Sequence, residues 1–124
     1  MVLMVVAVGL LAAAGPMEAH HSWQLDRSKV VDLKGTVTKF DFGNPHVQIY
    51  LQAKDDSGAE GNWTAGGPSP NQLSRSGWTR DTVKPGDQIS VAGYRNRDGS
   101  YVLRFDIVTL ASGQVMLGYR GFRR

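Results

Sequence analysis

Residues 30–42 read Val-Val-Asp-Leu-Lys-Gly-Thr-Val-Thr-Lys-Phe-Asp-Phe, and their pattern is the main indication of the fold class. Apolar and polar side chains alternate up to Val37, which is typical of a strand with one buried face. After Val37 the apolar positions move to Phe40 and Phe42, so we expect one extra residue near Lys39. Such a β-bulge bends a strand, and a long bent first strand indicates a small curled barrel.

Four shorter segments repeat this alternation, so we expect each to form a strand with one buried face. In the first of them, Ile49 faces the core, whereas Gln48 and Tyr50 face outward. Turns rich in Asp, Asn, Ser, Gly and Pro separate the segments. The segments cover residues 46–53, 62–65, 89–93 and 101–110, and the inward positions expected in the last are Leu103, Phe105 and Ile107.

One short helix is expected between the third and fourth strands. Ser69 suits the N-cap, Pro70 suits the first helical position, and Gln72 completes a capping box. Gly77 ends this helix after about two turns. Three strands, a short helix and two strands form the element order of an OB-fold. We therefore predict a mainly β protein, a five-stranded OB-like Greek-key barrel with one short helix between strands 3 and 4.

An uncharged apolar stretch opens the chain at residues 1–14. It is too short for a spanning helix, which needs about 20 apolar residues, and it fits the hydrophobic region of a secretory signal peptide. We expect cleavage after Ala19, with Ala14 as the alternative, and a periplasmic or secreted protein. The predicted organisation is a signal peptide at 1–19, an N-terminal arm at 20–29, the barrel at 30–113 and a basic C-terminal tail at 114–124. That tail includes a short edge strand at 115–117 and is loose from Gly118 onward.

Composition limits the chemistry that the chain can perform. The sequence has no cysteine, which excludes disulfides, thiolate metal sites and cysteine nucleophiles. The net charge is +3, and Arg120, Arg123 and Arg124 lie close to the C-terminus. These arginines indicate either a solvated basic tail or contact with an anionic surface or partner. No nucleophile elbow, phosphate-binding loop or zinc-protease motif occurs, so we expect no enzymatic activity.

The chain resembles a family of small exported bacterial proteins of unknown function with an OB-like β-barrel. The resemblance covers residues 20 to 113 and implies export and the barrel fold, but no activity. The matching stretches are Ala19-His20-His21-Ser22, Leu33-Lys34-Gly35-Thr36-Val37-Thr38-Lys39, Asn44-Pro45-His46, Gly67-Pro68-Ser69-Pro70-Asn71, Gly77-Trp78-Thr79-Arg80-Asp81 and Val83-Lys84-Pro85-Gly86-Asp87.

The histidines suggest a metal site as one hypothesis. Cleavage after Ala19 gives a mature N-terminus at His20, whose amine and imidazole, with the His21 ring, supply nitrogen donors that copper(II) accepts. Cleavage after Glu18 would instead place a histidine third, which also suits copper(II) through backbone amides. His46 completes the site if the arm lies along the mouth of the second strand. The alternative is a solvated histidine pair and a His46 that only caps a strand.

The polar side of the second strand indicates a recognition surface for a protein or glycan partner. Gln48 and Tyr50 are its candidates, and Trp23 and Trp63 are further candidate anchors. OB-folds also bind single-stranded nucleic acid, but export and the interspersed aspartates argue against that ligand. We expect no membrane contact after leader removal. The sequence thus favours an exported, periplasmic OB-like binding or accessory module of unestablished ligand, with a copper-binding protein as the alternative.

Overall fold

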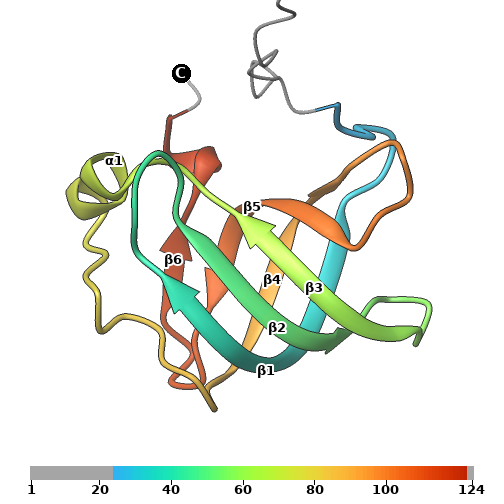
Figure 1. Cartoon of the computed structure of the whole chain (residues 1–124), viewed down its shortest axis with the longest axis horizontal. Coiled ribbons are helices and arrows are strands. Elements are labelled where there is room, and N and C mark those ends of the chain that lie inside the picture. Colours follow the sequence, from blue (N-terminus) through green and yellow to red (C-terminus); the bar gives the residue numbers. More distant parts are fainter. Residues whose placement is uncertain (1–23, 123–124) are drawn as a thin grey trace, which may run out of the picture.

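The computed structural model describes residues 24–122, which form a mainly β structure (Figure 1). Its elements are β1 Val31–Asp41, β2 Gln48–Lys54, β3 Glu60–Gly66, α1 Pro70–Arg75, β4 Gln88–Arg95, β5 Val102–Thr109, β6 Val115–Leu117 and the 3-10 helix η1 Tyr119–Phe122. Neighbouring strands follow the order β3-β2-β1-β4-β5, and a parallel pairing between β3 and β5 closes a five-stranded barrel. Helix α1 lies between β3 and β4, so the predicted fold class is confirmed.

Strand β1 is the long bent strand that joins the two halves of the barrel. Its first part pairs with β4 and its second part pairs with β2. Val37 lies opposite Leu51 and Lys39 lies opposite Tyr50, so Thr38 is the extra residue of a β-bulge. The predicted bend in this strand is therefore confirmed.

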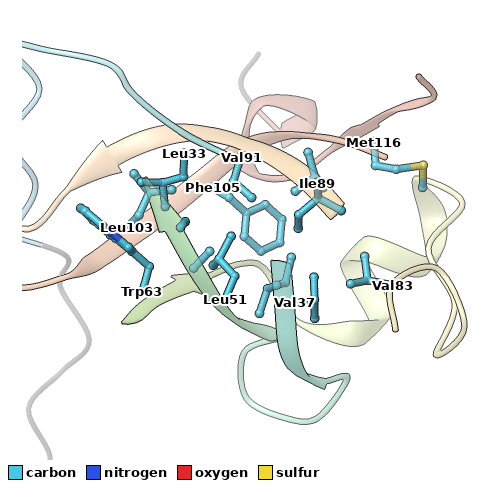
Figure 2. Packing of buried hydrophobic residues seen from close by; sticks show 14 of the residues in the cluster. Leu33, Val37, Leu51, Trp63, Val83, Ile89, Val91, Leu103, Phe105 and Met116 are labelled. Carbon is cyan, nitrogen blue, oxygen red and sulfur yellow. The ribbon is translucent and has the colours of Figure 1, made fainter. Parts of the chain in front are cut away.

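Large apolar side chains fill the barrel interior. Trp63, Trp78 and Phe105 are each no more than 2% exposed. Figure 2 shows the Phe105 ring at the centre of the buried cluster, and the Trp78 ring packs near it with 5.5 Å between ring centroids. No polar or charged residue is buried within the described range of the chain.

Helix α1 closes one end of the barrel. The Gln72 N–H donates to the Ser69 hydroxyl, and the Ser69 N–H donates to the Gln72 side chain, which confirms the predicted capping box. Gly77 follows the helix with a φ of +88°, the left-handed conformation that favours glycine at this position. Leu73 is fully buried against the core, so this short helix acts as a plug.

The inward pattern of β5 differs from the one that the sequence predicts. Phe105 and Ile107 lie opposite consecutive residues of β4, so Asp106 is an extra residue in β5. This bulge reverses which side chains face inward beyond it. Val108 is consequently buried and Ile107 faces outward, so the prediction of an inward Ile107 is wrong.

The C-terminal segment packs against the barrel, although the sequence predicts a loose tail from Gly118 onward. The predicted edge strand is present as β6, which pairs with β5. The Gly118 N–H donates to the Asp106 carbonyl at 2.8 Å, and the Tyr119 hydroxyl donates to the Gly67 carbonyl at 3.1 Å. A Cβ added at Gly118 would lie 2.4 Å from Phe105 Cδ2, so glycine allows this close approach.

Several predictions from the sequence concern residues outside the described range. The signal peptide at 1–19 lies there, and so do His20, His21 and Trp23 of the arm and Arg123 and Arg124 of the tail. Between residues 24 and 122, no helix is long and apolar enough to cross a membrane.

Candidate functional site

The outward side chains of β1, β2 and β3 form a continuous surface that we call the polar face. Antiparallel pairing places them in rows across the three strands. Lys39 lies opposite Tyr50, which in turn lies opposite Thr64. The polar face consists of Thr36, Lys39, Asp41, Gln48, Tyr50, Gln52, Asn62 and Thr64.

Tyr50 is the aromatic centre of the polar face. Its side chain is half-buried, and the Lys39 ammonium lies 5.5 Å from the centroid of its ring. A cation at this distance is attracted to the ring face, so Lys39 helps to hold the ring in place. Gln48 and Gln52 lie on the same side of β2 as Tyr50, two residues before it and two residues after it in the strand. An aromatic ring flanked by two amides can therefore contact one ligand.

The charges on these three strands cancel. Lysines and carboxylates occur in equal number, and the pair Lys54–Glu60 is 3.6 Å apart and exposed. An exposed pair of this kind adds little stability, but it leaves no net charge to attract a polyanion. The six charged residues of β1, β2 and β3 are Lys34, Lys39 and Lys54 against Asp32, Asp41 and Glu60.

A surface pocket of about 620 Å³ adjoins the polar face where β1, β2 and β4 meet. Lys34 lies opposite Lys54 across the β1–β2 pairing, so the pocket continues the rows of the polar face toward the β2–β3 turn. Its wall combines cations, carboxylates and a hydroxyl, which gives a ligand both donors and acceptors. The pocket is lined by Asp32, Lys34, Lys54, Asp55, Asp56 and Ser90.

Three loops of the described chain contain a turn with the pattern Asp-x-Ser, and Asp55 of one of these turns lines this pocket. In each, one carboxylate oxygen accepts both the N–H and the hydroxyl of the serine two residues later. The hydrogen bond from the serine side chain is the main cause that lowers the pKa of each aspartate, and nearby arginines lower it further. The three pairs are Asp26–Ser28, Asp55–Ser57 and Asp98–Ser100. The repeated pattern is visible in the sequence, but these turns were not among the predicted features.

The residues predicted for the recognition surface do not all lie on one surface of the barrel. Gln48 and Tyr50 lie together on the polar face, as predicted from their position in β2. Trp63 is 1% exposed and faces the core, so its assignment to the recognition surface is wrong. The reason is its place in β3, where the inward positions alternate with outward Asn62 and Thr64. Lys39 and these two β3 residues were missed, because only the pairing register brings them beside Tyr50.

Of the predicted metal ligands, His46 lies among the described residues, half-buried two positions before β2. The other two, His20 and His21, lie outside the described residues. Within residues 24–122, no three or more histidine, cysteine, aspartate or glutamate residues are grouped so that they could hold a metal ion. The copper site stays a prediction from the sequence.

A comparison with known proteins places the chain in a family. Residues 7–103 match a family of unknown function, DUF6152. Neither a curated protein nor a solved structure matches the chain. The matched segment covers most of the chain and includes β1, β2, β3, α1 and β4. The chain therefore belongs to DUF6152, a family of unknown function.

Proposed function

We propose that this protein is an exported OB-like binding module that recognises a saccharide on its polar face. The observation that carries the proposal is the arrangement of Tyr50 between Gln48, Gln52 and Lys39, with no net charge on the surrounding strands. Sugar recognition uses an aromatic ring against the C–H face of a pyranose and amides for its hydroxyls. In OB-folds, the face of strands 2 and 3 is an established site for oligosaccharides and oligonucleotides.

The charge distribution favours a saccharide over a nucleic acid. Single-stranded nucleic acids bind along a positively charged groove with stacked aromatic rings. Here Lys39 is accompanied by Asp41 on the same strand, and Tyr50 is the aromatic residue among the polar-face residues. A phosphate backbone would gain little attraction from such a surface.

The strand pairing favours a saccharide over an extended peptide. Peptides often bind by adding a strand to a free sheet edge, where main-chain hydrogen bonds supply the affinity. Strands β1 and β2 are paired on both sides, so the centre of the polar face has no free edge. A ligand on this face must be recognised by side chains.

Two features of the sequence support export. The apolar stretch at residues 1–14 fits a signal peptide. The motifs from His20-His21-Ser22 to Lys84-Pro85-Gly86-Asp87 resemble those of exported bacterial proteins. A periplasmic or secreted protein meets the glycan strands of the cell wall and other extracellular polysaccharides, which makes them the first ligands to test.

A binding assay with two matched tyrosine variants tests this function. Tyr50 and Tyr94 are both half-buried, both face outward, and each has a cationic side chain 5.5 Å from its ring centroid. We expect Tyr50→Ala to weaken binding of soluble glycan-strand fragments or neutral oligosaccharides at least tenfold, measured by calorimetry. Tyr94→Ala, on the other half of the barrel, should change the Kd less than twofold. Equal losses in both variants, or no binding of any saccharide by the wild-type protein, would contradict the proposal.

A further inference from the structure

A second surface, on the outer side of β4, β5 and β6, is apolar. Three of the four large apolar side chains that are exposed in the described chain lie here: Val30 at 50%, Val115 at 55% and Leu117 at 40%. The register places Ala92 opposite Ile107 and Ile107 opposite Leu117, so these residues form one row. We call this surface the apolar face and define it by Val30, Ala92, Ile107, Val115 and Leu117.

The apolar face is hollowed and has a basic rim. A pocket of about 420 Å³ has Val30, Ala92 and Ile107 in its wall, with Arg120 at its border. Tyr94 also lines this pocket, and the Arg27 guanidinium lies 5.5 Å from its ring centroid.

The acidic side chain in this pocket, Asp106, does not cancel the positive charge of the rim. Asp106 lies 3.7 Å from Arg104, and both side chains are largely buried, so this pair contributes no net charge. Arg27 and Arg120 are exposed and supply two positive charges to the rim, against one exposed carboxylate, Asp32, which lies opposite Ala92. The sequence adds Arg123 and Arg124 directly after η1, and no acidic residue follows Asp106.

We infer that the apolar face docks on an anionic lipid surface. Peripheral membrane binding combines buried apolar area with the attraction of basic residues to anionic headgroups. This surface supplies both, because exposed valine and leucine side chains lie beside Arg27 and Arg120. The polar face lies on the other half of the barrel, as Figure 1 shows for β2 and β3 against β5 and β6, so a docked molecule leaves it accessible. The arginines near the C-terminus indicated contact with an anionic surface as one alternative, whereas the sequence led us to expect no membrane contact after leader removal.

A second copy of the chain fits this surface less well. Edge strands join when their free main-chain groups pair across an interface. The Leu117 carbonyl of β6 already accepts a hydrogen bond from Trp78 Nε1 at 2.9 Å, so it is not free for an added strand. The arginines on the rim would also repel their copies across a two-fold axis.

Vesicle co-sedimentation of the purified mature protein tests the inference. We expect binding to vesicles of phosphatidylglycerol mixed with phosphatidylcholine, and much weaker binding to pure phosphatidylcholine. Binding should fall steeply as salt is raised, because salt screens the arginines. Arg120→Gln should reduce binding about fivefold, the factor expected for one basic residue near an anionic surface. Lys84→Gln removes one exposed positive charge from the turn that is hydrogen-bonded to Val37 of β1 and should leave vesicle binding unchanged.

A combined Val30→Ser, Val115→Ser and Leu117→Ser variant tests the apolar contribution and should lose at least tenfold in vesicle binding. All three side chains are exposed, so the barrel should stay folded, as checked by circular dichroism. Absence of binding to the phosphatidylglycerol vesicles would overturn the inference, as would equal effects of Arg120→Gln and Lys84→Gln. A concentration-dependent dimer that the triple variant abolishes, without vesicle binding, would assign the apolar face to a second copy and also overturn it.

Discussion

The indole Nε1 of Trp78 donates a hydrogen bond to the main-chain carbonyl of Leu117 at 2.9 Å. This contact joins the segment that follows helix α1 to the edge strand β6. The Trp78 ring is 2% exposed and lies between the rings of Phe40 and Phe105, with centroid distances of 6.2 and 5.5 Å. One side chain therefore links the helical plug, the core and the C-terminal segment.

Substituting Trp78→Phe should keep most of the ring packing and remove this hydrogen bond. The Leu117 carbonyl would lose its partner, and loss of such a bond typically costs about 1–3 kcal/mol of unfolding free energy. Urea unfolding measures the loss, and faster hydrogen exchange at the Gly118 amide would locate it. An unchanged stability, or a loss of protection spread evenly over the barrel, would contradict the role assigned to this contact.

Leu73 should contribute strongly to stability, because it fills the end of the barrel and is fully buried. Leu73→Ala is expected to lower the unfolding free energy by about 2–5 kcal/mol, the usual cost of such a cavity. Leu117→Ala is the matched control, since Leu117 is 40% exposed and its truncation should cost less than about 1 kcal/mol. Equal effects of the two substitutions would show that helix α1 does not plug the core.

The Asp-x-Ser turns should make stability depend on pH in the acid range. Hydrogen bonds from Ser28, Ser57 and Ser100 lower the pKa of their aspartates in the folded state. A lowered folded pKa stabilises the protein above the unfolded value of about 3.9, and this contribution is lost as the pH falls through the folded pKa values. We therefore expect the unfolding free energy to decrease as the pH drops below about 4.

The matched variant for this pH effect replaces all three serines with alanine. It should be less stable than the wild type at neutral pH and should show a flatter decline in unfolding free energy between pH 5 and pH 2. A decline with the same slope in both proteins would assign the acid sensitivity to other carboxylates.

The copper prediction has a direct test in solution. If His20, His21 and His46 form the predicted site, the mature protein should bind one equivalent of Cu(II) with a d–d absorption band. His20→Ala and His46→Ala should each shift this band and weaken binding at least tenfold. Gln24→Ala, a change at an exposed position within the arm, serves as the control. A titration that both histidine substitutions leave unchanged would exclude the site.

Alternation in the sequence predicted most of the barrel, because period-two patterns report directly on which side chains face inward. The bend of β1 was predictable from the change of apolar phase between Val37 and Phe40. The second bulge was not, because Ile107 and Val108 are both apolar and either can face the core. Pairing with β4 decides between them, and that register is a property of the folded sheet.

The two surfaces could be predicted only in part, for the same reason. Gln48 and Tyr50 share the outward side of one strand, so their proximity follows from sequence alone. Val30 is far from Ile107 and Leu117 in the chain. Only the pairing of β1 with β4, of β4 with β5 and of β5 with β6 gathers these residues on one side of the barrel. Trp63 was wrongly predicted to lie on the recognition surface. An aromatic residue in a strand suits a core and a ligand surface equally well, so its residue type alone does not distinguish the two.

Chemical-shift mapping with a saccharide locates the binding site residue by residue. Amide spectra of the mature protein should be recorded during titration with soluble glycan-strand fragments. We expect shifts concentrated at Gln48, Tyr50, Gln52 and Thr64, with residues 107–117 unaffected. Shifts centred on β5 and β6, or none up to millimolar ligand, would contradict a saccharide site on the polar face.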